Sequence, residues 1–170
     1  MPPFGSLAED HDAADRFRVD ALLLRLLSQV RLFAGFQRSD LLEILNVIEK
    51  VVFARGEYIF YEGDLGESLY ILISGEVQVI KGKTTHHPIE ITRFSPGESF
   101  GEMALVEKKP RSASIRTLDR CTVLRLNGKD LVHLPNAAAK LHFNIAKLLA
   151  TRLRDSNEII LGLKEHHHIT

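Results

Sequence analysis

Residues 100–115 contain the side chains whose types and spacing best suit ligand chemistry. Gly101 and Glu102 precede a short run of helical character, and Arg111 follows Glu102 by nine positions. Glycine allows close approach to the backbone, and the first amides of a helix attract an anion. Arg111 offers a planar fork of donors for two phosphate oxygens. The carboxylate of Glu102 can only accept, so it suits a sugar hydroxyl. The segment predicts a site for a ligand with a hydroxyl pair and one anionic phosphate.

The same segment resembles the phosphate-binding cassette of the cyclic nucleotide-binding domain. The resemblance rests on the runs Phe-Gly-Glu-Met-Ala-Leu (100–105) and Pro-Arg-Ser-Ala-Ser-Ile (110–115). Residues 56–64 and 69–77 are similar to strands and turns of that family's barrel, and the likeness covers roughly residues 30–155. The family includes the catabolite activator protein, regulatory subunits of cyclic-AMP-dependent kinase and cyclic-nucleotide-gated channels. The resemblance implies a bacterial receptor for cyclic AMP or cyclic GMP, bound as a regulatory ligand without a cofactor.

The resemblance also implies which residues contact the nucleotide. Arg111, Ser112 and the Ala113 amide would contact the phosphate. The ribose and the adjoining wall would be contacted by residues at the start of the cassette: Phe100, Gly101, Glu102, Met103 and Ala104. A hydroxyl at Ser112 can bond the phosphate or the exocyclic amine of a guanine, so it leaves both bases open, with cyclic AMP favoured.

The last helix is expected to move when ligand binds. In the family this helix folds over the base, and one of its side chains caps the purine. Arg152 lies four residues after Leu148 and seven after Ile145, which places it on the same helical face. A guanidinium there can stack on a base. The alternative is a solvated arginine, like the neighbouring Arg154. The function implied is allosteric signal transduction by repacking of the C-terminal helices.

The elements that position this site follow from a change of hydrophobic period. Helical spacing at residues 18–50 predicts N-terminal helices, the second one capped by Ser39. Short β-branched and aromatic runs punctuated by glycines at 51–126 predict an antiparallel barrel or jelly roll. Helical spacing returns at 127–165, as hinge and lid helices. The fold class is α+β, with flexible tails expected at 1–17 and 166–170.

The bulk properties narrow the class of protein. The chain has 170 residues, 22 basic and 22 acidic side chains, and one cysteine. Because the net charge is zero, we expect no overall electrostatic attraction to nucleic acid or to a membrane surface. A lone thiol in a strand fits a reducing cytoplasm. No apolar run approaches 18 residues, so we expect no membrane insertion. A cupin-type metal enzyme is disfavoured because His86 and His87 are adjacent and would point to opposite faces of a strand. We expect that the protein is not an enzyme.

Three alternatives stay open. The barrel could be a degenerate docking or dimerisation module, or it could bind a cyclic dinucleotide, although one arginine matches one phosphate better than two. The leucine-rich segment 22–30 could pack on the barrel or form the seam of a homodimer. No helix-turn-helix follows the last helix, so direct DNA binding is not expected, and the effector is an unidentified protein or domain.

Overall fold

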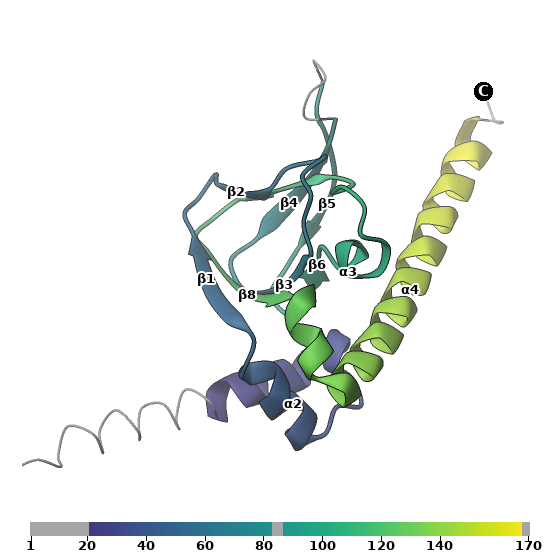
Figure 1. Cartoon of the computed structure of the whole chain (residues 1–170). Coiled ribbons are helices and arrows are strands. Elements are labelled where there is room, and N and C mark those ends of the chain that lie inside the picture. The colour runs from purple at the N-terminus through teal and green to yellow at the C-terminus, as the bar shows by residue number, and fades with distance from the viewer. Residues whose placement is uncertain (1–20, 83–86, 168–170) are drawn as a thin grey trace, which may run out of the picture.

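Two four-stranded antiparallel sheets form a sandwich of the jelly-roll type (Figure 1). The structure, a computed structural model, describes residues 21–82 and 87–167. The first sheet has the strand order β1-β8-β3-β6 and the second β2-β7-β4-β5. Their bounds are β1 Glu49–Phe53, β2 Tyr58–Phe60, β3 Ser68–Ser74, β4 Val77–Lys81, β5 Ile89–Phe94, β6 Ser99–Phe100, β7 Ser114–Thr117 and β8 Cys121–Asn127. The predicted α+β fold is confirmed.

Helices lie at both ends of the strand-rich region. Residues 21–29 are helical, and they are followed by η1 (Arg31–Phe33) and α2 (Arg38–Leu45). The short α3 (Met103–Glu107) lies inside the cassette, and η2 (Gly128–His133) leads to the long α4 (Pro135–His167). The predicted tail 1–17 lies outside the described residues. Helix α4 continues to His167, two residues into the segment predicted as a C-terminal tail.

The central strands of the first sheet, β3 and β8, are buried on both faces because their side chains alternate between two cores. Leu69 and Ile71 of β3 pack against the helices, whereas Tyr70 and Leu72 point between the sheets. Successive side chains of a strand face opposite sides, so one strand serves both cores. The sandwich core thus holds the second sheet in place, and the helical core attaches the N-terminal helices and α4 to the opposite face of the first sheet.

The segment 21–30 belongs to the helical core. Leu27 and Val30 are buried in it, and Leu23 and Leu24 pack against its edge, whereas Leu22 is exposed. Of the two roles left open for this leucine-rich helix, packing within the chain is the one that the residues on its inner side have.

The predicted N-cap of the second helix is wrong by two residues. The helix begins at Arg38, and Gln37 is its N-cap. The Gln37 amide donates to the Asp40 carboxylate (2.7 Å), and the Gln37 side chain accepts from the Asp40 amide. This reciprocal capping box satisfies two helix-end donors. Asp40 is also bonded to Lys140 Nζ at 2.5 Å, and this hydrogen bond is the main reason why the pKa of Asp40 is lowered.

A second polar anchor fixes the N-terminal half of α4. The Asn144 amide donates to the carbonyls of Leu32 (2.8 Å) and Ala34 (2.9 Å) at the end of η1. These carbonyls would otherwise lack helical partners. Together with the Lys140–Asp40 pair, the amide fixes where along its length α4 meets the N-terminal helices.

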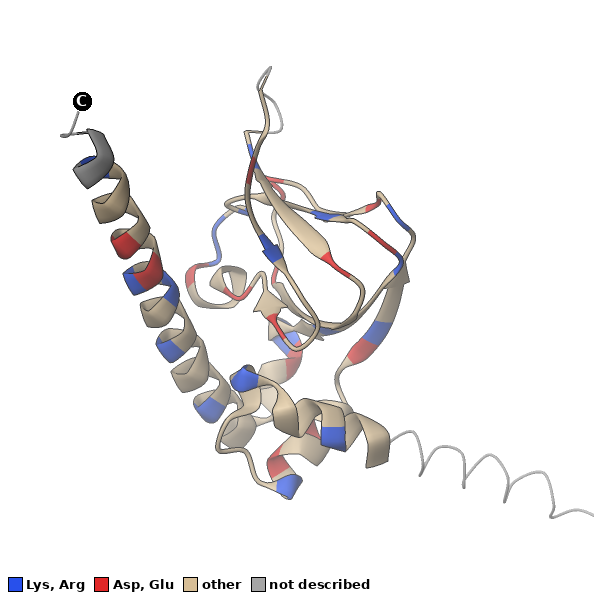
Figure 2. Cartoon of the chain, turned by 180° about the vertical axis from the view of Figure 1, so that it is seen from behind, with Lys and Arg blue, Asp and Glu red and all other residues tan. Residues whose placement is uncertain are grey.

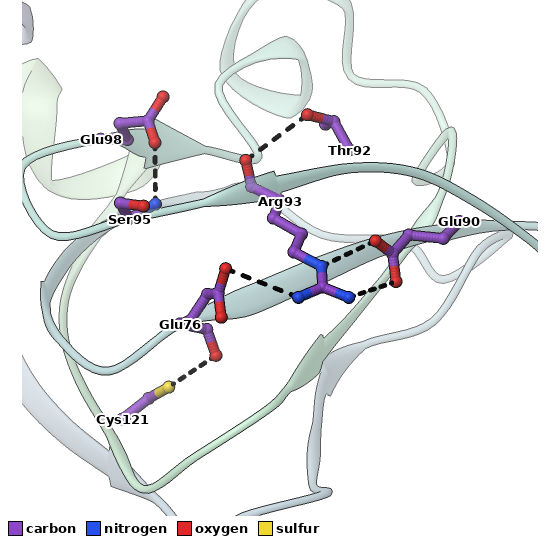
Figure 3. A network of polar contacts seen from close by, with 7 residues as sticks. All are labelled: Glu76, Glu90, Thr92, Arg93, Ser95, Glu98 and Cys121. Atoms are coloured by element: carbon purple, nitrogen blue, oxygen red, sulfur yellow. Dashed lines mark hydrogen bonds and ion pairs between the residues drawn. The ribbon is translucent and has the colours of Figure 1, made fainter.

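Charged side chains make contacts along the edge strand β5, in the turn after it, and to Glu76 just before β4 (Figure 3). Arg93 contacts Glu90 (2.7 Å) and Glu76 (3.8 Å), and Glu98 accepts from the Ser95 amide. Exposed ion pairs contribute only ~0–1 kcal/mol each, so their main effect is on the course of the strand. The Cys121 thiol donates to the Glu76 carbonyl (3.3 Å), and burial raises the pKa of this thiol.

Basic and acidic residues both occur on the strands and on α4 (Figure 2), where Lys140, Lys147, Arg152 and Arg154 precede Asp155 and Glu158 along the helix. Among the described residues, no helix combines the length and apolarity needed to cross a membrane.

Candidate functional site

The cassette runs from β6 through α3 to β7, beside the β2–β3 loop. Gly101, which links β6 to α3, has φ +77°, a backbone conformation that residues other than glycine rarely adopt. A Cβ at this position would lie 2.8 Å from Arg111 Nη1 and 3.2 Å from the Ser68 carbonyl. The local fold therefore requires glycine for both its backbone angle and the close approach of an arginine.

Arg111 is buried and is held by backbone carbonyls. Its Nη1 donates to Gly101 O (2.9 Å) and its Nη2 to Ser68 O (2.7 Å). The guanidinium lies 4.1 Å from the centre of the Phe60 ring, a favourable cation–π position. Nε has no hydrogen-bond partner. Burial lowers the pKa of Arg111, and nearby groups, among them Asp64, partly offset this effect.

Glu102 is a buried carboxylate, with only 2% of its surface exposed. One oxygen, Oε1, is bonded to Arg152 Nη1, and the other, Oε2, has no partner. Burial raises the pKa of Glu102, while the charge of Arg152 and the hydrogen bond to it act in the opposite direction. The arginine from α4 therefore favours the ionised form of this carboxylate, together with a backbone hydrogen bond and the charge of Arg111.

Arg152 reaches the cassette from the last helix. Besides Glu102 it contacts Ser99, whose carbonyl accepts from Nη2 at 2.6 Å. Its guanidinium lies 4.8 Å from the centre of the Phe94 ring. The prediction that Arg152 projects inward from α4 is supported by these contacts, which a solvated arginine would not make.

These residues surround one open cavity of about 640 Å³, a volume that includes its solvent-filled mouth. All nine residues predicted for the ligand site line it: Phe100, Gly101, Glu102, Met103, Ala104, Arg111, Ser112, Ala113 and Arg152. They differ in accessibility. Ala104 and Phe100 are buried, whereas Met103 is exposed. The sulfur of Met103 lies 4.0 Å from the hydroxyl oxygen of Ser112.

Sequence reasoning missed several lining residues. The apolar wall is completed by Phe60, Val79, Phe94 and Ile115, which come from β2, β4, β5 and β7. Strand alternation indicates that they face inward, but only the pairing of the strands brings them together. Gly66, in the β2–β3 loop, was also missed. A Cβ there would lie 2.7 Å from Arg111 Nη2, and no local pattern indicates this contact.

The cavity is lined by hydrogen-bond donors and acceptors, and its described residues do not form a metal site. Among residues 21–82 and 87–167, no group of three or more His, Cys, Asp or Glu side chains could hold a metal ion. The arrangement suits a ligand that donates a hydrogen bond to a carboxylate oxygen of Glu102 and accepts one from the guanidinium of Arg111, with an apolar and aromatic wall around it.

Comparison with known proteins gives a consistent result. Residues 50–137 match the family described as the cyclic nucleotide-binding domain. The chain is 32% identical over 126 residues to the cyclic AMP receptor protein of Thermus thermophilus, covering 74% of this chain and 58% of that protein. It is 34% identical over 104 residues to the regulatory subunit of cyclic-AMP-dependent protein kinase of Emericella nidulans, covering 61% of this chain and 24% of the relative.

Solved structures agree. The catabolite activator protein of Thermus thermophilus superposes with a TM-score of 0.70 at 31% identity, covering 79% of this chain and 63% of that chain. The regulatory domain of Toxoplasma gondii protein kinase A with cyclic AMP gives a TM-score of 0.68 at 26% identity, covering 80% and 52%. This chain thus spans less than two thirds of these relatives. The sequence match, the jelly-roll sandwich and the cassette geometry together show that the chain belongs to the cyclic nucleotide-binding domain family.

Proposed function

We propose that this chain is a receptor module for a cyclic purine mononucleotide, with cyclic AMP preferred over cyclic GMP. One observation carries the proposal. Two of the buried side-chain polar atoms that lack a partner, Glu102 Oε2 and Arg111 Nε, both belong to residues that line the same cavity. An ionised carboxylate oxygen can only accept, and a guanidinium nitrogen can only donate.

Leaving a buried polar atom unsatisfied costs about 1–3 kcal/mol. A ligand that brings a hydroxyl to the first atom and an anion to the second removes both costs. A ribose cyclic phosphate has these two groups close together on one ring. The 2′-hydroxyl would donate to Glu102, and the phosphate would accept from Arg111 with help from Ser112 and the Ala113 amide.

The remaining lining residues have supporting roles in this proposal. Backbone at Gly101, Met103 and Ala104 would border the ribose, and Phe100 would form the floor beneath it. The Ser112 hydroxyl is exposed and could serve the phosphate or a guanine amine, so it does not choose the base. Cyclic AMP is favoured because the relatives described above are named for that nucleotide.

The output that we propose is allosteric rather than catalytic. Binding would draw the cassette inward and repack α4, and the new arrangement would be read by a partner protein, a further domain or a second copy of the chain. The ligand can shift this equilibrium only by its difference in affinity for the two arrangements. We place the receptor in the cytoplasm, since its one cysteine is a buried free thiol.

The test is isothermal titration with cyclic AMP and cyclic GMP on the wild type, Arg111→Ala and Arg120→Ala. Arg120 is an exposed arginine outside the cavity and serves as the control. Losing a buried charged partner costs ~2–5 kcal/mol, so Arg111→Ala should weaken binding by about 30-fold to several thousand-fold. Arg120→Ala should bind like the wild type.

Thermal melting distinguishes a folding defect from a binding defect. If the Arg111→Ala protein has a lowered melting temperature, the second variant is Arg111→Lys, which keeps the positive charge but not the paired donors of the guanidinium. Binding of neither nucleotide by a folded wild-type protein would refute the proposal. A thermal shift with a cyclic dinucleotide would then favour that ligand, and no shift at all would favour a docking module.

A further inference from the structure

Arg152 makes polar contacts that join the distal half of α4 to the sandwich. Helix α4 packs chiefly against η1, α2 and η2, and Leu149 is its last residue in the helical core. From 153 to 164 its residues are exposed, apart from the partly exposed Gly162. Within this exposed stretch and the turn before it, Arg152 is the side chain that is hydrogen-bonded to Glu102 and Ser99 and lies over the Phe94 ring. Figure 1 shows the helix continuing past the cassette toward its C-terminal end.

This side chain contacts the carboxylate that the proposed function assigns to the sugar. Arg152 engages Glu102 Oε1 and leaves Oε2 unpartnered. An arginine bonded to one oxygen fixes the rotation of the whole carboxylate, because the two oxygens are rigidly joined. It also supplies the opposite charge that a buried carboxylate needs in order to stay ionised.

We propose that Arg152 is a positioning residue for sugar recognition, and that it acts through Glu102 rather than on the base. The inference rests on the proposed function. In this arrangement the 2′-hydroxyl is recognised by a carboxylate that α4 holds in place. Recognition of that one hydroxyl and docking of α4 on the cassette then favour each other, and by linkage the coupling is reciprocal.

Two other roles for Arg152 give different results. A base cap stacks on the purine, so its loss would weaken the ribonucleotide and its 2′-deoxy analogue by the same factor. A latch that occupies the cavity must leave before ligand enters, so its loss would strengthen binding of both. A positioning residue changes the ratio of the two affinities, since only one of the ligands has the hydroxyl.

The experiment is isothermal titration of cyclic AMP and 2′-deoxy cyclic AMP with the wild type, Arg152→Ala, Arg152→Gln and Arg154→Ala. Arg154 is the matched control, an exposed arginine two residues along the same helix. A hydrogen bond to a charged group is worth about 10- to 100-fold in affinity, which is the preference for cyclic AMP expected in the wild type and in Arg154→Ala. Arg152→Ala should reduce that preference to about threefold or less, and Arg152→Gln, which keeps a donor without the charge, should be intermediate.

A pH series adds a readout that a purely structural role would not change. Removing Arg152 takes away its charge and its hydrogen bond, which both oppose the effect of burial, and leaves a backbone hydrogen bond and the charge of Arg111, so the pKa of Glu102 should rise further. The preference for the 2′-hydroxyl in Arg152→Ala should therefore recover as the pH is raised and Glu102 ionises. In the wild type it should vary less over the same range.

Each result decides between the two proposals. If the wild type binds neither cyclic AMP nor cyclic GMP, the proposed function fails and this inference fails with it. If the wild type binds but does not prefer the 2′-hydroxyl, the receptor function stands, but the assignment of that hydroxyl to Glu102 fails together with this inference. If the wild type has the preference and the Arg152 variants keep it, only the inference is overturned. Arg152→Gln decides the question if Arg152→Ala does not fold.

Discussion

Gly66 offers a sharp test of how Arg111 is held, because this glycine touches the guanidinium from the neighbouring loop. A Cβ added at Gly66 would lie 2.7 Å from Nη2 and 2.8 Å from Nε. The φ angle of Gly66 is outside the left-handed range, so alanine is compatible with the backbone. We therefore expect Gly66→Ala to leave the fold intact and to move the side chain of Arg111.

The size of the effect follows from these distances. Ordinary van der Waals contact begins at 3.4 Å, so the guanidinium must retreat by about 0.7 Å. A retreat of this size away from Ser68 would lengthen its 2.7 Å bond to the carbonyl of that residue to about 3.4 Å, beyond the usual range of an effective hydrogen bond. A phosphate contact misplaced by the same amount weakens similarly. One charged hydrogen bond is worth about 1.5–3 kcal/mol, which corresponds to a loss of about 10- to 100-fold in nucleotide affinity.

A double-mutant cycle provides the assay. Nucleotide affinity is measured by titration for wild type, Gly66→Ala, Arg111→Ala and the double variant, with Leu65→Ala as an exposed control in the same loop. In the Arg111→Ala background no guanidinium remains to be displaced, so Gly66→Ala should have no further effect. Equal losses in both backgrounds, or no loss in the wild-type background, would refute the reasoning.

Two further predictions concern stability. Asp40→Asn should destabilise the protein by ~0.5–1 kcal/mol at pH 7, because it keeps an oxygen for the Gln37 amide but removes the charge that pairs with the partly exposed Lys140. The folded-state pKa of Asp40 is lowered, so its contribution is present above the unfolded pKa of about 4 and is lost as the pH falls through the folded value. Urea denaturation from pH 7 to pH 2 should show the two proteins converging in acid, and a constant difference would contradict this account. Lys108 ends α3 with φ 52°, a left-handed conformation in which glycine is favoured by about 1 kcal/mol. Lys108→Gly should therefore raise the melting temperature by a few degrees, and Lys108→Val should lower it; the opposite order would mean that the backbone relaxes here.

The cassette could be predicted from sequence because its residues are close together in the chain. Gly101, Glu102 and Arg111 have chemical types that limit what they can bind, and they are separated by only ten positions. The change of hydrophobic period likewise predicted the sandwich and its flanking helices. Both kinds of information are local, so they can be recognised in the sequence without knowledge of the tertiary fold.

What could not be predicted depends on contacts between distant segments. Phe94 and Val79 enter the cavity wall only because β4, β5 and β7 pair in a particular register. Gly66 matters only because Arg111 folds back against it. The Arg152–Glu102 pair joins residues 50 positions apart, and a helical face shows that Arg152 points inward without showing which group it meets. The cap at Gln37 was missed for a different reason, since serine is the commoner N-cap residue.

The two polar anchors near the start of α4 give this helix the geometry of a lever. Asn144 is held at η1 and acts as the fulcrum, with Arg152 on the short arm and the far described end of the helix on the long arm. At 1.5 Å of rise per residue, Arg152 lies about 12 Å and Lys164 about 30 Å from this fulcrum. A tilt that displaces the Arg152 end by 2 Å therefore displaces the Lys164 end by about 5 Å, close to one helical pitch. Under the proposed function, a displacement of Arg152 that follows ribose recognition would thus be magnified about 2.5-fold along a rigid rod.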